Sequence, residues 1–231
     1  MKMRLAAGLL LCGLSAGWIH AQGEAALVRE VVNVKMEVDR NNAELRQYTW
    51  TEHTEVLVKG DVKQNRAALC RYDAAGKLVK TPVDTGDPKK KDKGAVSNRV
   101  VVRKKADIQD YIERAITMIQ NYVPPSPEQL QFLLTSGGAS MGKSEGGKSE
   151  IRFTNYFQRG DSMVFTYDTE SKLLLKAAIT STMGTPKDPV TLEALWEKLP
   201  DGVNHVASTD LKAPAKKVEV KTRNVLYQKA P

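Results

Sequence analysis

Six consecutive segments in the second half of the chain carry the apolar and polar alternation of β-strands, and this series constrains the fold more than any other feature. The segments span residues 151–158, 162–168, 173–183, 190–197, 203–211 and 216–227. Turn-forming residues separate them, including Arg159-Gly160-Asp161 and Leu199-Pro200-Asp201-Gly202. A period of two places the large side chains of each segment on one face of a sheet. The second half of the chain is therefore predicted to be all strand.

The first half combines helices with a shorter set of strands. Apolar residues at helical spacing predict helices over residues 24–46, 107–122 and 126–134. Asp107 is the expected N-cap of the second helix, and Pro124-Pro125 is expected to end it. An antiparallel meander is predicted over residues 48–58, 67–72 and 77–83. Because helices and strands are segregated along the chain, we expect one α+β domain over residues 22–231, a curved antiparallel sheet covered by helices.

The N-terminus has the order of a secretory signal peptide. Lys2 and Arg4 precede an apolar run from Leu5 to Trp18, which is shorter than the ~20 residues of a membrane-spanning helix. Residues 1–21 are predicted to be the signal peptide, with cleavage near Ala21. Lipidation at Cys12 and a retained N-terminal anchor are the alternatives. We therefore expect an exported protein, either periplasmic or secreted.

The positive charge of the chain is concentrated in one segment. The 35 basic and 27 acidic residues give a net charge of +8. Ten of the basic residues and three of the acids lie between Lys77 and Lys105, and residues 84–105 are predicted to form a basic loop. The candidates for contact with an anionic membrane surface are Lys89, Lys90, Lys91, Lys93, Arg103, Lys104 and Lys105. A solvated loop is the simpler interpretation, and export argues against nucleic acid as a partner.

Several motifs point to chemistry that their context does not support. Gly137 to Ser144 matches the phosphate-binding string G-x-x-x-x-G-K-S, but a helix is predicted before it and no helix after it. Residues 136–149 are instead expected to form a flexible Gly/Ser/Lys loop. Arg159-Gly160-Asp161 matches a cell-adhesion tripeptide, but the turn between two strands explains it as well. Both strings are therefore interpreted as structural.

Residues with catalytic chemistry are few. The chain has two cysteines and three histidines, which excludes a disulfide scaffold and a cysteine-rich zinc module. Cys70 is expected to be a buried, inert thiol, and His53 and His205 are expected to be surface residues on strands. A metal site built on both histidines is possible by composition but is not specified by their spacing. We expect no enzymatic activity, no cofactor and no metal.

Aromatic residues on the strands raise the question of a ligand cavity. The candidates for its lining are Trp50, Phe153, Phe157, Phe165 and Trp196. A filled core between sheet and helices is the ordinary explanation of such residues. An open, curved sheet can instead enclose an apolar ligand, with the helices as a plug. The alternation of apolar and polar residues does not distinguish a filled core from a ligand cavity.

Three stretches resemble those of uncharacterised exported bacterial proteins: Leu45 to Trp50, Asn155 to Ser162 and Leu199 to Gly202. The order of elements also resembles, more distantly, the LolA-like half-barrel of periplasmic lipoprotein carriers. The resemblance implies an incomplete antiparallel barrel that holds acyl chains under a cover of helices. We therefore expect a non-enzymatic envelope protein that binds or carries an apolar ligand. The alternative is a filled-core scaffold that binds another envelope protein.

Overall fold

A computed structural model describes residues 15–83, 98–123, 125–142 and 144–230. The α-helices are α1 (Ser15–Leu45), α2 (Asn98–Ile119) and α3 (Pro127–Ser136), and a 3-10 helix spans Pro214–Lys216. The strands are β1 (Tyr48–Val58), β2 (Asp61–Tyr72), β3 (Leu78–Val83), β4 (Ala139–Met141), β5 (Lys148–Thr154), β6 (Ser162–Asp168), β7 (Leu174–Thr182), β8 (Pro189–Lys198), β9 (Asn204–Ala213) and β10 (Val218–Lys229). The predicted α+β class is confirmed.

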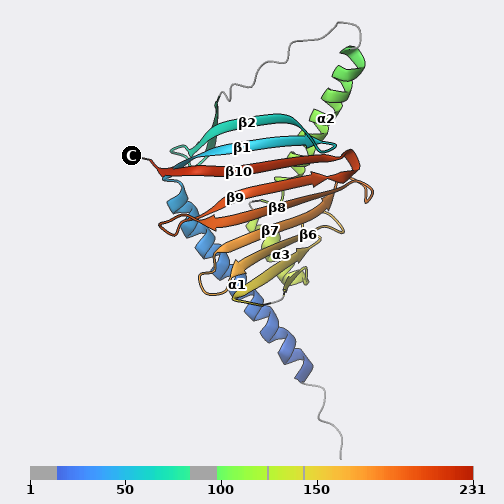
Figure 1. Ribbon diagram of the computed structural model, residues 1–231. Helices are drawn as coiled ribbons and strands as arrows, with labels where there is room; N and C mark the ends of the chain where they lie inside the picture. Colours follow the sequence, from blue (N-terminus) through green and yellow to red (C-terminus); the bar gives the residue numbers. More distant parts are fainter. Residues whose placement is uncertain (1–14, 84–97, 124, 143, 231) are drawn as a thin grey trace, which may run out of the picture.

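The ten strands form one open, curved antiparallel sheet in the order β3-β2-β1-β10-β9-β8-β7-β6-β5-β4 (Figure 1). Strands that lie side by side in the sheet also follow each other in the chain, except that β1 pairs with β10. This pairing joins the N-terminal meander to the six C-terminal strands in a single sheet. The turn from β1 to β2 has Lys59 and Gly60 at φ of 59° and 85°, the left-handed conformation that two-residue hairpins favour.

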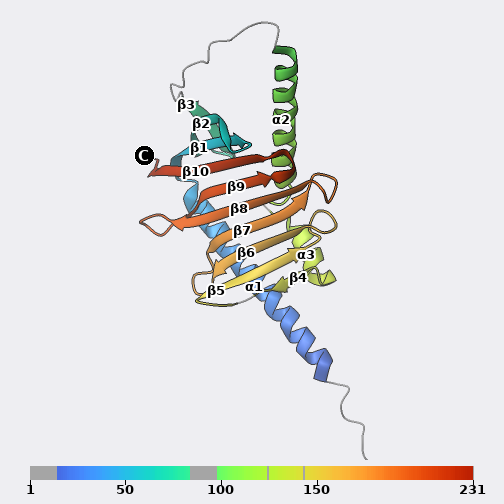
Figure 2. The same ribbon diagram turned by 45° about the vertical axis from the view of Figure 1, so that its right-hand side comes forward.

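All three helices lie on one face of the sheet, which we call the helix face (Figures 1 and 2). The helices bury Leu27, Val31, Val34, Tyr111, Ile112, Ala115, Ile119 and Leu133 against it. The strands contribute Ile151, Phe153, Met163, Ile179, Val190, Leu211 and Val220 among others. Phe153, Met163 and Ile179 are at most 2% exposed. The opposite face, here the outer face, carries the residues of the other parity.

Helix α1 is a single helix that passes the expected cleavage position at Ala21 without a break. The alternating run from Val32 to Val38 is part of this helix and not a strand. Burial accordingly follows helical spacing, with Val31 and Val34 buried and Val32 and Met36 exposed. Within the part of the chain that the structure describes, no helix has the length and apolar character needed to cross a membrane.

Helix α2 begins nine residues before the position that the sequence analysis expected. It starts at Asn98, so Asp107 lies inside the helix and is not its N-cap. The intervening residues 98–106 contain neither glycine nor proline, so nothing in them ends the helix. Arg103, Lys104 and Lys105 are therefore helical, which corrects the predicted loop over residues 98–105, while residues 84–97 lie outside the described residues. Lys89, Lys90, Lys91 and Lys93 lie outside the described residues.

The predicted flexible loop over residues 136–149 is corrected in part, because β4 and the start of β5 lie within it. Gly137 caps the end of α3 at φ 76°, and β4 then pairs with β5, which begins at Lys148. The phosphate-binding string therefore follows a helix C-terminus and runs into strands. This is the reverse of the strand-to-helix order that gives a phosphate its ring of backbone N–H groups.

Strand β5 ends at Thr154, four residues before the predicted end, because Asn155 adopts a φ of 54°. Asp161 fixes the turn that follows: its carboxylate accepts hydrogen bonds from the backbone N–H groups of residues 156, 157 and 158 at 2.6–2.9 Å. The Tyr122 hydroxyl donates to the same carboxylate at 2.7 Å. Asp161 is 3% exposed, so it holds the hairpin and does not present an adhesion ligand.

Candidate functional site

A hollow of about 370 Å³ lies at the end of the sheet formed by β1, β2 and β3. Its lining consists of Glu52, Thr54, Asn65, Arg66, Ala67, Ala68, Lys80, Pro82 and Val83. Glu52, Ala68 and Pro82 stand opposite one another on the three strands and so share a face. Val56, further along β1 with the same parity as Glu52, belongs to the core under the helices. The hollow therefore lies on the helix face, next to the part that the helices cover.

Ala68 of β2 makes room for this hollow, because it stands on the same face as Glu52 and Pro82. Ala67 and Ala68 carry only a methyl group each, where the neighbouring positions Arg66 and Leu69 carry long side chains. Alanine is a poor strand former, so this pair is not explained by strand propensity. Ala67 points to the other face of β2. We therefore infer that Ala68 sets the depth of the hollow, and that a large side chain at position 68 would fill it.

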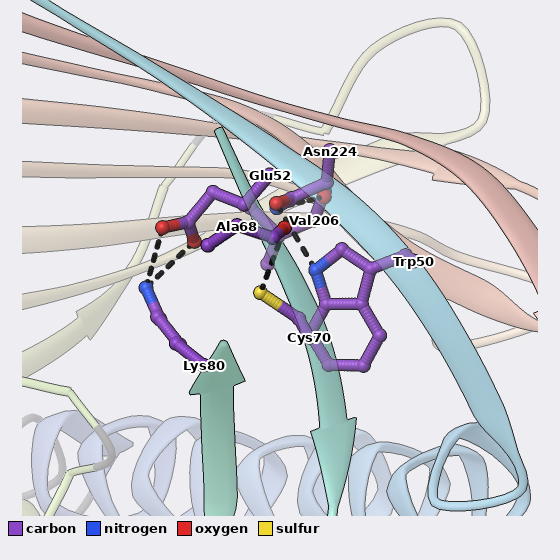
Figure 3. A network of polar contacts seen from close by, with 7 residues as sticks. All are labelled: Trp50, Glu52, Ala68, Cys70, Lys80, Val206 and Asn224. Carbon is purple, nitrogen blue, oxygen red and sulfur yellow. Dashed lines mark hydrogen bonds and ion pairs between the residues drawn. The ribbon is translucent and has the colours of Figure 1, made fainter. Parts of the chain in front are cut away.

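An ion pair crosses the hollow from β3 to β1. Lys80 Nζ lies 2.7 Å from each carboxylate oxygen of Glu52 and reaches over β2 beside Ala68 (Figure 3). The Glu52 side chain is 15% exposed and that of Lys80 is 45% exposed. The partly buried carboxylate therefore has a charged partner, and Lys80 keeps contact with water.

Arg66 is the third charged residue of the lining. It lies opposite Thr54 of β1, is exposed, and makes no ion pair with another described residue. One carboxylate against two cations leaves the lining with a net charge of +1. The hollow thus combines apolar walls with one uncompensated positive charge.

The wall next to the ion pair is fixed by hydrogen bonds (Figure 3). Trp50 Nε1 donates to Asn224 Oδ1 at 3.2 Å, and Asn224 Nδ2 donates to the Val206 carbonyl at 2.9 Å. This chain of contacts ties β1 to β10 and β9. Cys70 is fully buried beside Trp50, and its thiol donates to the Ala68 carbonyl at 3.7 Å. Burial raises the pKa of the Cys70 thiol, with a further contribution from Glu52, so the predicted buried thiol is confirmed.

An aromatic cluster continues this wall. The Tyr227 ring stacks on Trp50 with centroids 5.4 Å apart, and the His205 ring lies 4.2 Å from the Tyr227 ring. The expectation that His205 is a surface residue is wrong, because its side chain is buried with 6% exposed. Burial lowers the pKa of His205, and its Nδ1 has no hydrogen-bond partner among the described atoms. His53, in contrast, is exposed on β1 as expected.

The structure does not bring the five predicted lining residues together. Phe153 is in the core, and Phe165 and Trp196 are partly buried against it. Phe157 lies in the turn after β5 and is 53% exposed, because the strand ends before it. Trp50 packs with Tyr227 at the other end of the sheet. None of the five lines the hollow, although Trp50 supports its wall.

The residues that do line the hollow were missed by sequence reasoning. The sequence does contain a sign of the hollow. Glu52 and Thr54 are polar, although they lie on the same face of β1 as the apolar residues Val56 and Val58. A run of polar residues at core positions marks the place where a covered face becomes open. Lys80 gave no such signal, because its pairing with Glu52 depends on the register of β3 with β2.

Comparison with known proteins adds one structural similarity. No family model matches the chain, and no curated protein matches it in sequence. The crystal structure of a DUF1329 family protein from Desulfovibrio piger ATCC 29098 aligns with 86% of this chain and 92% of its own, with a TM-score of 0.38 and 9% identity. The site is therefore interpreted from its own residues.

Proposed function

We propose that this protein is an exported, non-enzymatic envelope protein that binds an apolar or amphiphilic ligand, such as an acyl chain, in the hollow on β1, β2 and β3. In this proposal the open end of the sheet acts as the half-barrel that holds the ligand. The supporting observation is the hollow itself. Its volume of about 370 Å³ falls within the roughly 300–1,000 Å³ of small-molecule sites.

Ala68, Pro82 and Val83 offer the apolar surface for such a ligand. Removing that surface and the ligand's own chain from water supplies the driving force, at about 25 cal/mol per Å² of apolar area. The core under the helices is a poorer candidate, because Phe153, Met163 and Ile179 already fill it. A ligand there would have to displace packed side chains, which costs free energy.

A binding role also suits the chemistry of the neighbouring groups. Cys70, the thiol nearest to the hollow, is fully buried and its pKa is raised, so it is a weak nucleophile. The Glu52 carboxylate is paired with Lys80 across the hollow. These residues stabilise the wall of the hollow.

The test is native mass spectrometry of residues 22–231, prepared without detergent and then incubated with fatty acids and phospholipids. Wild-type protein is expected to carry an adduct of lipid mass. Ala68→Trp, which fills the hollow, should lose the adduct. Leu69→Trp is the matched control, because it changes the next residue of β2 on the outer face and should keep it. Equal adducts on both variants would overturn the proposal.

A second candidate function is that of a filled-core module that binds another envelope protein. The observation that favours it is the packing of the core, in which Met163 and Val190 have no exposed surface. A clean apoprotein mass after every incubation would support this candidate over ligand binding.

The proposal includes docking on an anionic membrane through the basic segment. Replacing Lys89, Lys90, Lys91 and Lys93 with serine removes four positive charges, each of which contributes about 1 kcal/mol near an anionic surface. Weaker binding to vesicles containing phosphatidylglycerol is expected. Unchanged binding would remove the docking step and leave ligand binding in place.

A further inference from the structure

We propose that the ligand of the hollow carries an anionic head group, and that the Arg66 guanidinium binds this group at the rim. The inference rests on the proposed function and names the chemical class of its ligand, a single-chain amphiphile with a phosphate or carboxylate head. It follows from the charges of the lining and from where they stand.

Of the two cations in the lining, Lys80 is paired with a carboxylate and Arg66 is paired with none in the described part of the chain. Lys80 contacts both oxygens of Glu52 at 2.7 Å, so this pair is neutral as a unit. Arg66 has no ionic partner among the described residues and is exposed at the rim. The one net positive charge of the lining is therefore located at Arg66.

Arg66 lies next to the apolar surface of the hollow. Arg66 and Ala68 have the same parity on β2, and Ala68 stands opposite Pro82 on β3. Arg66 is the next residue of this face along β2, so a chain lying along the strand over Ala68 would have one end beside Arg66. An amphiphile matches this arrangement, because its head and its chain each find a complementary surface.

The Arg66 side chain has the chemistry to recognise an anionic head group. A guanidinium presents a planar fork of N–H donors that fits two oxygens of a phosphate or carboxylate. A partly exposed contact of this kind contributes less than a buried one because water screens it. The apolar chain is therefore expected to supply most of the affinity, and Arg66 the selectivity for the head.

The experiment is isothermal titration calorimetry with three probes: decyl phosphate, decanol and inorganic phosphate. The proteins are the wild type, Arg66→Gln and Arg71→Gln. Arg71 is the matched control, because it is an exposed arginine of the same strand that faces the outer side. Circular dichroism confirms that both variants are folded.

Wild type and Arg71→Gln are expected to prefer decyl phosphate over decanol. Arg66→Gln should bind decyl phosphate about three- to tenfold more weakly and decanol unchanged. Decyl phosphate binding that is unaffected by Arg66→Gln would overturn the inference while ligand binding stands. Inorganic phosphate that binds as tightly as decyl phosphate would also overturn it, since the site would then recognise a free anion. Failure of all three probes would overturn both the inference and the proposed function.

Discussion

The two ends of the helix face follow the same alternation of residues but differ in what lies on them. Between β5 and β9 the face carries large apolar residues such as Phe153 and Ile179, and α1, α2 and α3 cover it. Between β1 and β3 the same parity carries Glu52, Arg66 and Lys80, and the described lining of the hollow includes no helix residue. One end is packed and the other is open.

The difference shows that alternation reports the face of a residue and not the depth of its burial. Val56 and Glu52 point to the same side of β1, yet Val56 joins the core and Glu52 needs a lysine partner. The free energy of folding is expected to come mainly from the packed end. Substitutions in the lining of the hollow are expected to cost less free energy of unfolding, because the lining residues do not belong to the core cluster of the described residues.

The largest expected effect is the loss of a core ring from the packed end. Phe153→Ala should lower the free energy of unfolding by about 3–5 kcal/mol, because it leaves a cavity among side chains that cannot collapse into it. Urea unfolding followed by circular dichroism measures the change. The control is Phe157→Ala, an equal truncation at a half-exposed turn position, which should cost about 1 kcal/mol or less. Equal losses would contradict the contrast between core and turn.

An intermediate effect is expected when a buried alanine is enlarged. Ala115 of α2 has no exposed surface, so Ala115→Leu should overpack the core and lower stability by about 1–3 kcal/mol. Ala68→Leu adds the same atoms to the hollow and should change stability by less than about 0.5 kcal/mol. The midpoints of urea unfolding compare the two. A large loss for Ala68→Leu would mean that the hollow is already filled.

The smallest expected effect is a pH dependence of stability that comes from His205, in the aromatic cluster beside the hollow. Burial lowers the pKa of His205, so the unfolded chain takes up a proton at higher pH than the folded protein does. The contribution of His205 to the free energy of unfolding is therefore complete above the ordinary histidine pKa of about 6.5, and it is lost as the pH falls below that value.

Urea unfolding between about pH 7 and about pH 5 should show stability falling with acid in the wild type. His205→Phe should reduce this dependence, whereas His53→Phe, a change at an exposed position, should keep it. A wild-type slope that survives in His205→Phe would assign the effect to other groups.

Much of the fold could be predicted from the sequence. The strand at 162–168 has the predicted bounds. The helix predicted over residues 126–134 is found as α3, and Ser126 caps it by accepting a hydrogen bond from the Gln129 N–H. The start of α2 could not be predicted, since Asp107 resembles a cap in sequence but residues before it also favour helix.

The candidate site was less predictable, because it depends on pairing between distant strands. Glu52 and Lys80 are 28 positions apart, and only the register of β1, β2 and β3 places them in contact. The five aromatic candidates were selected by parity, and four of them lie in the core or in a turn. Parity alone could not show which part of the face is covered.

The most direct test of the account is to map amide chemical shifts of ¹⁵N-labelled protein during titration with decyl phosphate. We predict that the largest shift changes occur on β1, β2 and β3 around Glu52, Ala68 and Lys80, while the amide shifts of Met163 and Ile179 do not change. Changes concentrated at Phe153, Met163 and Ile179 would contradict it, since the ligand would then enter the core beneath the helices.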